Sequence, residues 1–153
     1  MLSRFKLLIT YDGTNYQGWQ IQKDGRTVQG IIENAFRDLS EFDEKIRLNG
    51  SGRTDAGVHA LGQVAHIDFK TNLSVQVLKN ALNAKLPGDC RIIKIEQVEK
   101  NFHSRYDAKK RYYMYQCYNG DSILYRNQCW MIHNINIVIL NKLASNLIGN
   151  HDF

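Results

Sequence analysis

The order of alternating and helix-periodic segments limits the possible folds of this chain more than any other feature of its 153 residues. Apolar side chains recur at every second position in several runs, and this period is typical of strands with one buried face. A short run leading into a glycine-rich segment indicates one more strand. We expect strands over residues 5–11, 46–49, 63–69, 91–98 and 109–118.

Helical stripes of apolar residues lie between these runs. One begins after Thr27 and one after Ser74, both good N-cap residues, and Pro87-Gly88 ends the second. A third stripe ends near Gly149, a residue suited to the position after a helix. The order strand, helix, two strands, helix, two strands, helix predicts an α+β domain of ferredoxin-like or RRM-like type, with helices packed on one face of an antiparallel sheet.

Composition narrows the class of protein and of partner. Hydrophobic residues make up 43% of the chain and charged residues 23%, with a net charge of +5. This balance is typical of a globular protein, and its sign suits a polyanionic partner such as RNA. The three cysteines form no CxxC pair, which argues against a zinc site and for reduced thiols. We see no signal peptide and no membrane span, and we expect a cytoplasmic protein.

The run from Gly52 to Ala60, Gly-Arg-Thr-Asp-Ala-Gly-Val-His-Ala, concentrates the chemistry of the chain. Its glycines suit a tight loop, and Asp55 is the only carboxylate in it. An Asp beside Gly often accepts backbone hydrogen bonds in its own turn, which is the structural interpretation. Arg53, two residues away, could instead keep Asp55 ionised by ion pairing, which favours a catalytic group.

Other side chains offer further candidate sites. His59, His66 and Asp68 do not have the spacing of a metal site, so we expect no metal and a supporting role for His59 in the loop. Basic residues near aromatic ones suit phosphate contacts combined with base stacking, although charge runs are usually solvated faces. This set is Arg4, Lys6, Lys23, Arg26, Arg105, Lys109, Lys110 and Arg111.

The run Gly52–His59 resembles, over eight consecutive residues, the signature of the tRNA pseudouridine synthases of the TruA type. More of that family's pattern recurs in the same order, so the similarity covers essentially the whole chain. The further matching segments are Tyr11–Thr14, Tyr16 with Gly18–Gln20, Gln63–Val64, Asn83–Asp89, Phe102–Tyr106, Ala108–Arg111 with Tyr113 and Tyr115, and Gly149–Phe153.

The resemblance implies isomerisation of uridine to pseudouridine in the anticodon stem-loop of tRNA, without metal, nucleotide or organic cofactor. Asp55 would be the catalytic residue, attacking either the ribose or the base ring. Arg53 would orient Asp55 and help to displace the backbone at the flipped base. Residues that would bind substrate are Gly52, Thr54, His59, Arg105 and Tyr113, with Tyr113 stacking on the target base.

The resemblance also implies an organisation into two parts. We expect a catalytic domain over residues 1–120 and the start of a second half over 121–153. Members of the family continue beyond the His-Asp-Phe motif, so we expect this chain to be the N-terminal part of the family fold. Its apolar last helix would pair in a homodimer or with the continuing half.

Two other interpretations of the chain stay open. One is a ferredoxin-like RNA-binding domain without catalysis, which would need basic and aromatic residues on its sheet but not Asp55. The other is an inactive fragment or structural subunit that has lost its chemistry, against which the intact signature argues.

Overall fold

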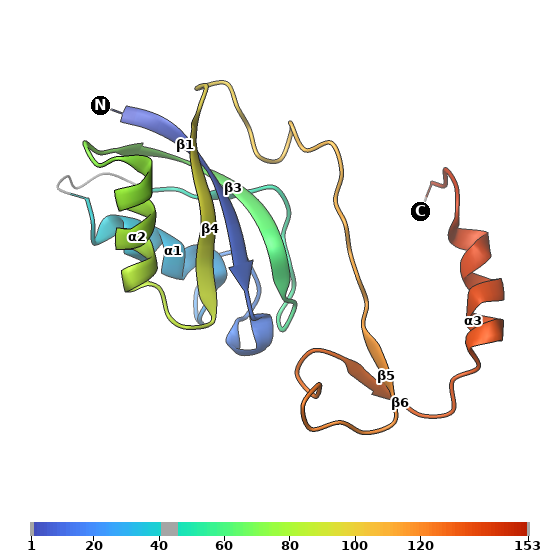
Figure 1. Cartoon of the computed structure of the whole chain (residues 1–153). Coiled ribbons are helices and arrows are strands. Elements are labelled where there is room, and N and C mark those ends of the chain that lie inside the picture. Colours follow the sequence, from blue (N-terminus) through green and yellow to red (C-terminus); the bar gives the residue numbers. More distant parts are fainter. Residues whose placement is uncertain (1, 41–45, 153) are drawn as a thin grey trace. The chain divides into compact units, whose positions relative to one another are not determined.

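The computed structural model describes residues 2–40 and 46–152, and Figure 1 shows the path of the chain. Met1 and Phe153, the latter part of the terminal motif noted above, lie outside the described residues. The chain divides into two compact units, one ending at Arg111 and one beginning at Tyr112. Each unit is described by itself.

The first unit is built on an antiparallel sheet whose strands are ordered β2-β3-β1-β4. In this sheet β1 lies between β3 and β4, and Phe5 faces Ile67 on one side and Gln97 on the other. The short β2 pairs with β3 and leads into the glycine-rich run. The strands are β1 (Leu2–Tyr11), β2 (Asn49–Gly50), β3 (Ala60–Lys70) and β4 (Cys90–Val98).

Two helices, α1 (Val28–Arg37) and α2 (Val75–Lys85), cover one face of this sheet (Figure 1). Both N-caps form as the sequence predicts. The Thr27 side chain accepts a hydrogen bond from the Gly30 amide, and the Ser74 side chain accepts one from the Val77 amide. The core lies between helices and sheet, and its fully buried large side chains include Leu7, Ile9, Ile32, Phe36, Ile67, Leu78, Leu82 and Ile92.

A buried carboxylate joins α1 to the segment that precedes the glycine-rich run. Glu33 is 6% exposed, and its Oε1 accepts hydrogen bonds of 2.9 Å from the Leu48 amide and from Gln29 Nε2. An amide buried without an acceptor costs about 1–3 kcal/mol, so Glu33 stabilises the approach of this segment to α1. The position of β2, and of the loop after it, therefore depends on the helix.

The other face of β1 carries positive side chains that are already paired. Arg4 donates two hydrogen bonds of 2.7 Å, one to each carboxylate oxygen of Asp68. Lys6 Nζ lies 3.1 Å from Glu96 Oε2. The carboxylates come from β3 and β4, the strands on either side. These two members of the basic set are therefore charge-compensated within the sheet.

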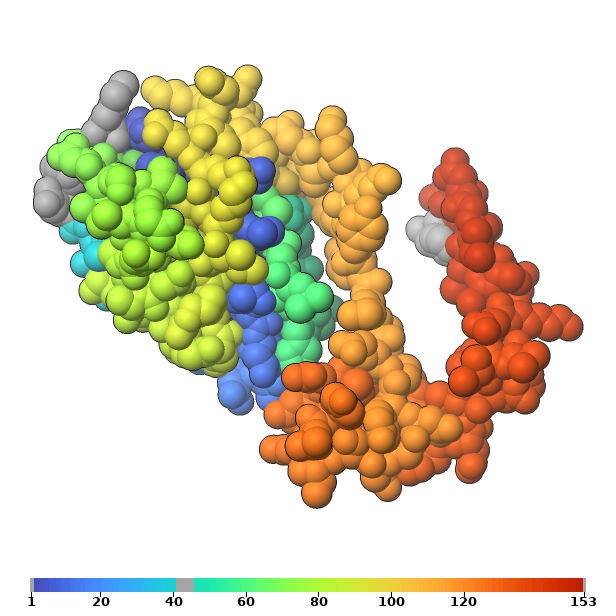
Figure 2. Space-filling model, viewed as in Figure 1, coloured from blue at the N-terminus to red at the C-terminus, as the bar shows by residue number. Residues whose placement is uncertain are grey.

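The second unit contains a small parallel pair, β5 (Cys117–Asn119) and β6 (Trp130–Ile132), followed by α3 (Ile137–Ala144) and a 3-10 turn over Ser145–Leu147. None of its described residues is buried. In Figure 2 the atoms of the first unit, coloured blue to yellow, pack densely.

The prediction of a strand over 109–118 is wrong for residues 109–116, which have no regular structure. The run is rich in aromatic and alternating residues, but a strand is stable only when a neighbour completes its backbone hydrogen bonds. Within this run the pairing with β6 begins at Cys117, and before it the Gln116 carbonyl accepts from the Trp130 amide at 2.8 Å.

Candidate active site

The glycine-rich run forms the loop between β2 and β3, and backbone contacts hold it at both ends. The Ser51 amide donates to the Val64 carbonyl at 2.7 Å, and Gln63 Nε2 donates to the Gly52 carbonyl at 2.7 Å. Within the loop, the Thr54 carbonyl accepts from the Trp19 amide at 2.9 Å. These bonds fix the backbone on both sides of Asp55.

The segment after β1 approaches this loop so closely that only glycine fits at two positions. A Cβ at Gly13 would lie 2.0 Å from the Val58 carbonyl oxygen, and one at Gly18 would lie 2.6 Å from that of Thr54. Gly18 also has a φ of 90°, which disfavours other residues. The close contact between the two segments therefore depends on the absence of a side chain at Gly13 and Gly18.

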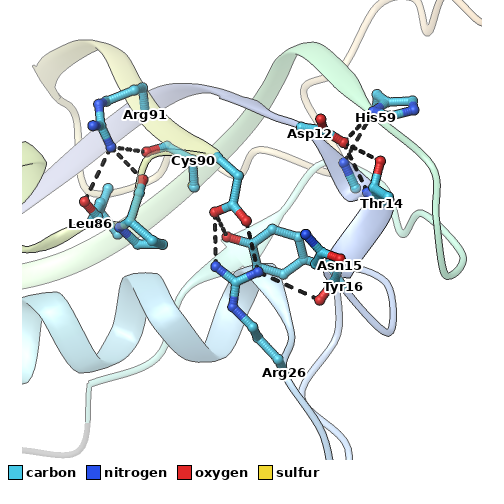
Figure 3. A network of polar contacts seen from close by, with 12 residues as sticks. Asp12, Thr14, Asn15, Tyr16, Arg26, His59, Leu86, Cys90 and Arg91 are labelled. Atoms are coloured by element: carbon cyan, nitrogen blue, oxygen red, sulfur yellow. Dashed lines mark hydrogen bonds and ion pairs between the residues drawn. The ribbon is translucent and has the colours of Figure 1, made fainter. Parts of the chain in front are cut away.

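Polar side chains brace the same contact (Figure 3). His59 Nδ1 lies 3.2 Å from the Gly13 amide and 3.0 Å from a carboxylate oxygen of Asp12. Asp12 also accepts from the amide and hydroxyl of Thr14, and these hydrogen bonds lower the pKa of its carboxyl group. At the other end of the loop, the Thr54 hydroxyl is 2.8 Å from that of Tyr11. His59 and Thr54 thus connect the loop to β1 and the turn that follows it.

A second network, also drawn in Figure 3, anchors the 12–27 segment. Arg26 donates to both carboxylate oxygens of Asp89 at 2.8 Å and lies 4.0 Å from the centre of the Tyr16 ring. The Tyr16 hydroxyl donates to Asp89 at 2.7 Å. The hydrogen bonds from Arg26 lower the pKa of Asp89, and burial raises that of Tyr16. The charge of Arg26 is therefore already paired, with Asp89, within the fold.

Asp55 lies exposed on the wall of a cavity of about 390 Å³. Among the described residues its carboxylate has no hydrogen-bond or ion-pair partner, and this includes Arg53, for which an ion pair was one possibility. The other residues of this wall are Arg53, Thr54, Ala56, Gln17, Gln20 and Gln22. A carboxylate placed in this way is accessible to a substrate.

The glutamines were not identified as site residues by sequence reasoning. Gly18-Trp19-Gln20 was visible only as part of a family motif, and nothing in its local chemistry indicates a cavity. Trp19 is 3% exposed and its ring lies against Gly50 of β2, whereas Gln20 is exposed and lines the cavity. The signal could have been the glycine that lets this segment approach the signature loop.

A second cavity, of about 620 Å³, adjoins the first along Arg53 and Gln20, which line both. Gly52 contributes to its wall, and so does Arg105, the sequence-based candidate for an RNA contact. Arg111 donates to the carbonyls of Ser51 and Arg105 and so ties the chain after β4 to the signature loop. The structure thus brings Gly52, Arg53 and Arg105 together.

Tyr113 belongs to the second unit, where it is 76% exposed. Its neighbour Tyr115 is 80% exposed and contacts Trp130 edge to face, with ring centres 6.1 Å apart. Neither tyrosine belongs to a core in the described part of this unit.

Neither a metal centre nor a membrane-spanning helix is found in the part of the chain that the structure describes. No three His, Cys, Asp or Glu side chains in 2–40 and 46–152 are placed to hold a metal ion. Within the same ranges, no helix has the length and apolar character needed to cross a bilayer.

The fold and the loop define an antiparallel α+β domain that presents one carboxylate at a cavity from a glycine-rich loop. Residues 7–107 match the family model described as tRNA pseudouridine synthase. The chain therefore belongs to the tRNA pseudouridine synthase family.

Relatives in several bacteria are similar over nearly the whole chain. Proteins named tRNA pseudouridine synthase A are 41% identical in Parvibaculum lavamentivorans, covering 99% of this chain, and 44% identical in Ehrlichia chaffeensis, covering 98%. A third, from Dictyoglomus thermophilum, is 45% identical over 97% of the chain. The chain spans about three fifths of the length of these relatives, 62–63%.

The turn that carries Arg105 is fixed to the sheet through His66. The Ser104 amide donates to His66 Nδ1 at 3.1 Å, and the Ser104 hydroxyl donates to the Asn49 carbonyl at 2.7 Å. His66 is 3% exposed; burial, and then the positive charges of Arg4 and His103, lower its pKa to about 4, against the opposing effect of Asp68 and Asp107. The neutral imidazole is therefore the form that accepts from Ser104.

We predict that acid weakens the fold through His66. In the unfolded chain this residue binds a proton near pH 6.5, whereas in the folded chain it does so only near pH 4. Its contribution to the free energy of unfolding is therefore fully present above pH 6.5 and is lost as the pH falls to 4. The loss is up to about 3 kcal/mol. Urea unfolding at several pH values measures it. His66→Gln should flatten this pH dependence, whereas His133→Gln, at an exposed position, should leave it; an unchanged slope in His66→Gln would contradict the assignment.

Proposed function

We propose that this protein isomerises uridine to pseudouridine in tRNA, with Asp55 as the catalytic residue. The observation that carries this proposal is the Asp55 carboxylate itself, which is exposed at a cavity and without a partner among the described residues. Its loop is held by hydrogen bonds to the Thr54 and Gly52 carbonyls, so the carboxylate is presented from a fixed backbone. Membership of the family supports the same chemistry.

The reaction breaks the bond from the ribose to a ring nitrogen and forms one to a ring carbon. The carbon loses a proton and the nitrogen gains one, so product and substrate are isomers and no oxidant or group donor is consumed. Asp55 acts as nucleophile. It attacks either the ribose carbon, releasing the base, or the base ring, and both routes return the carboxylate at the end. Since the bond cannot be reached within a stack, the target base must leave the helix.

The remaining loop residues have supporting roles in this proposal. Arg53 extends along the wall shared by both cavities and takes the place of the displaced nucleotide or meets its phosphate. Thr54 and Gly52 line the cavities and hold Asp55 in place, and His59 braces the loop against Gly13. Arg105 contacts the RNA backbone from the second cavity.

Tyr113 is proposed to stack on the target base. Its ring is 76% exposed, so its surface is available to a ligand. Stacking of a base on an aromatic ring contributes about 1–3 kcal/mol, enough to hold a base outside its helix.

We infer that the first unit has a ferredoxin-like fold. The strand order β2-β3-β1-β4 with α1 and α2 as crossovers supports this assignment. We further propose that residues 1–120 form the catalytic domain and that 121–153 begin a second half. The proposed substrate is the anticodon stem-loop of tRNA, and no cofactor is implied. Three cysteines without disulfides support a reducing compartment, the cytoplasm.

A non-catalytic RNA-binding domain is the second candidate function. The arginines of the second cavity favour it, because they suit RNA whether or not chemistry follows. The two functions differ in their need for Asp55. The enzyme requires it for turnover, whereas the RNA-binding domain has no turnover and does not require it.

We expect Asp55→Asn to reduce pseudouridine formation by at least about a thousandfold, because a neutral amide is a poor nucleophile. Tritium release from tRNA labelled at the ring carbon of uridine measures turnover. The mutant should keep its melting temperature and its affinity for tRNA. Glu99→Gln, a change at another exposed carboxylate, should leave turnover unchanged. Appreciable turnover by Asp55→Asn would remove Asp55 from its role.

Tyr113 and Tyr115 provide a matched pair, since both rings are mainly exposed. Tyr113→Ala should lower turnover by about tenfold or more through the lost stacking, and Tyr115→Ala should lower it much less. Tyr113→Phe should keep most activity if stacking is the only role. Equal losses in the two alanine variants, accompanied by equal drops in melting temperature, would speak against a special role for Tyr113.

We propose that the apolar side chains of the last helical segment are covered by another protein surface, in a homodimer or in the continuing half. Leu140, Leu143 and Leu147 are 49%, 59% and 64% exposed, and apolar area left in water forgoes about 25 cal/mol per Å². Sedimentation of the 153-residue chain should show self-association that Leu143→Glu reduces and Leu61→Glu, at another exposed site, does not. A monomer at every concentration would contradict the homodimer.

A further inference from the structure

We propose that the second cavity is a binding site for an unpaired nucleotide, whose base stacks on Tyr106 and whose phosphate is held by Arg47, Arg53 and Arg105. It would hold the neighbour of the nucleotide that reaches Asp55. The assignment rests on the proposed function in that it takes RNA as the ligand.

Tyr106 is the outer ring of a short aromatic column. Its ring centre lies 4.2 Å from that of His103 at an angle of 30°, and His103 in turn lies 4.6 Å from the buried His66. The column thus starts in the sheet and ends at a ring that is 77% exposed. A flat ring that is supported from behind and open in front is the surface on which a nucleobase stacks.

The turn that carries Tyr106 is held in place before any ligand arrives. His103 Nδ1 accepts from the amides of Arg105 and Tyr106 at 3.3 and 3.4 Å. The Asp107 carboxylate accepts from the His103 amide at 2.7 Å, and Ser104 is bonded to His66. Binding therefore need not order this turn, which favours affinity.

The charge around the ring suits a phosphate. Arg47, Arg53 and Arg105 line the cavity, and no hydrogen bond or ion pair joins their guanidinium groups to any described residue. No Asp or Glu is among the described residues that line it. In contrast, Arg4 and Arg26 are each paired with a carboxylate. Unpaired guanidinium groups beside an open aromatic ring match a phosphate and a base together.

The location next to the first cavity indicates which nucleotide is bound. Arg53 and Gln20 line both cavities, so the two sites share a wall. A strand that places one base at Asp55 would pass its next phosphate along Arg53. The second cavity would then receive the adjoining base and keep it from stacking back on the first.

The test uses a single-stranded RNA pentanucleotide of uridines with 2-aminopurine at its centre, whose fluorescence is quenched on stacking. The wild-type chain should bind and quench it. Tyr106→Ala should weaken binding by about tenfold or more and remove the quench, whereas Tyr106→Phe should keep both. The control is Tyr125→Ala, which removes an exposed tyrosine that also stacks on another ring, Tyr118.

A second variant guards against loss of the turn in Tyr106→Ala. Arg105→Gln keeps the ring column, so it should keep the quench at saturation but weaken binding and reduce its dependence on salt. Binding and quenching by Tyr106→Ala equal to those of the wild type would overturn the inference, as would a wild-type chain that does not quench.

The assay separates this inference from the proposed function. If the wild type quenches the probe through Tyr106 but forms no pseudouridine in tRNA, the nucleotide site stands and the enzymatic proposal falls. If pseudouridine forms while Tyr106→Ala behaves as wild type toward the probe and tRNA, the enzymatic proposal stands and the nucleotide site falls.

Discussion

The close backbone contact between the segment after β1 and the signature loop is the constraint on which the candidate site depends. At Gly13 and Gly18 a Cβ would overlap the carbonyl oxygens of Val58 and Thr54, so any other residue would push the two segments apart. The hydrogen bond from the Trp19 amide to Thr54 exists because of this approach. It fixes Thr54, the residue before Asp55, and holds nearby the segment whose glutamines line the same cavity as the carboxylate.

Ion pairs divide the basic residues into two groups with different roles. Arg4 and Arg26 are held by Asp68 and Asp89, and they stabilise the sheet face and the loop base. Arg53 and Arg105 have no such partner among the described residues and line cavities instead. This division could not be predicted from the positions of charged residues in the sequence. The carboxylates that pair with Arg4 and Arg26 lie more than sixty positions away.

Much of the first unit followed from local patterns. The helix caps at Thr27 and Ser74 form as expected because an N-cap depends only on residues three positions away. Residues 109–116, in contrast, have strand-like alternation but no regular structure, since pairing depends on a neighbour that local sequence does not specify. Arg53 and Asp55, two residues apart, likewise form no ion pair in the structure, because closeness in sequence does not set the direction of two side chains on a loop.

The sequence by itself determined the order of the elements in the first unit and the residues of the signature loop. It could do so because periodicity, capping and turn formation act over a few residues. Only the tertiary structure decided that Gln20 and Arg53 stand between two cavities, and that His66, His103 and Tyr106 form one column. Those arrangements join β3, the loop after β1 and the turn after β4, and they arise from packing between segments that are distant in the chain.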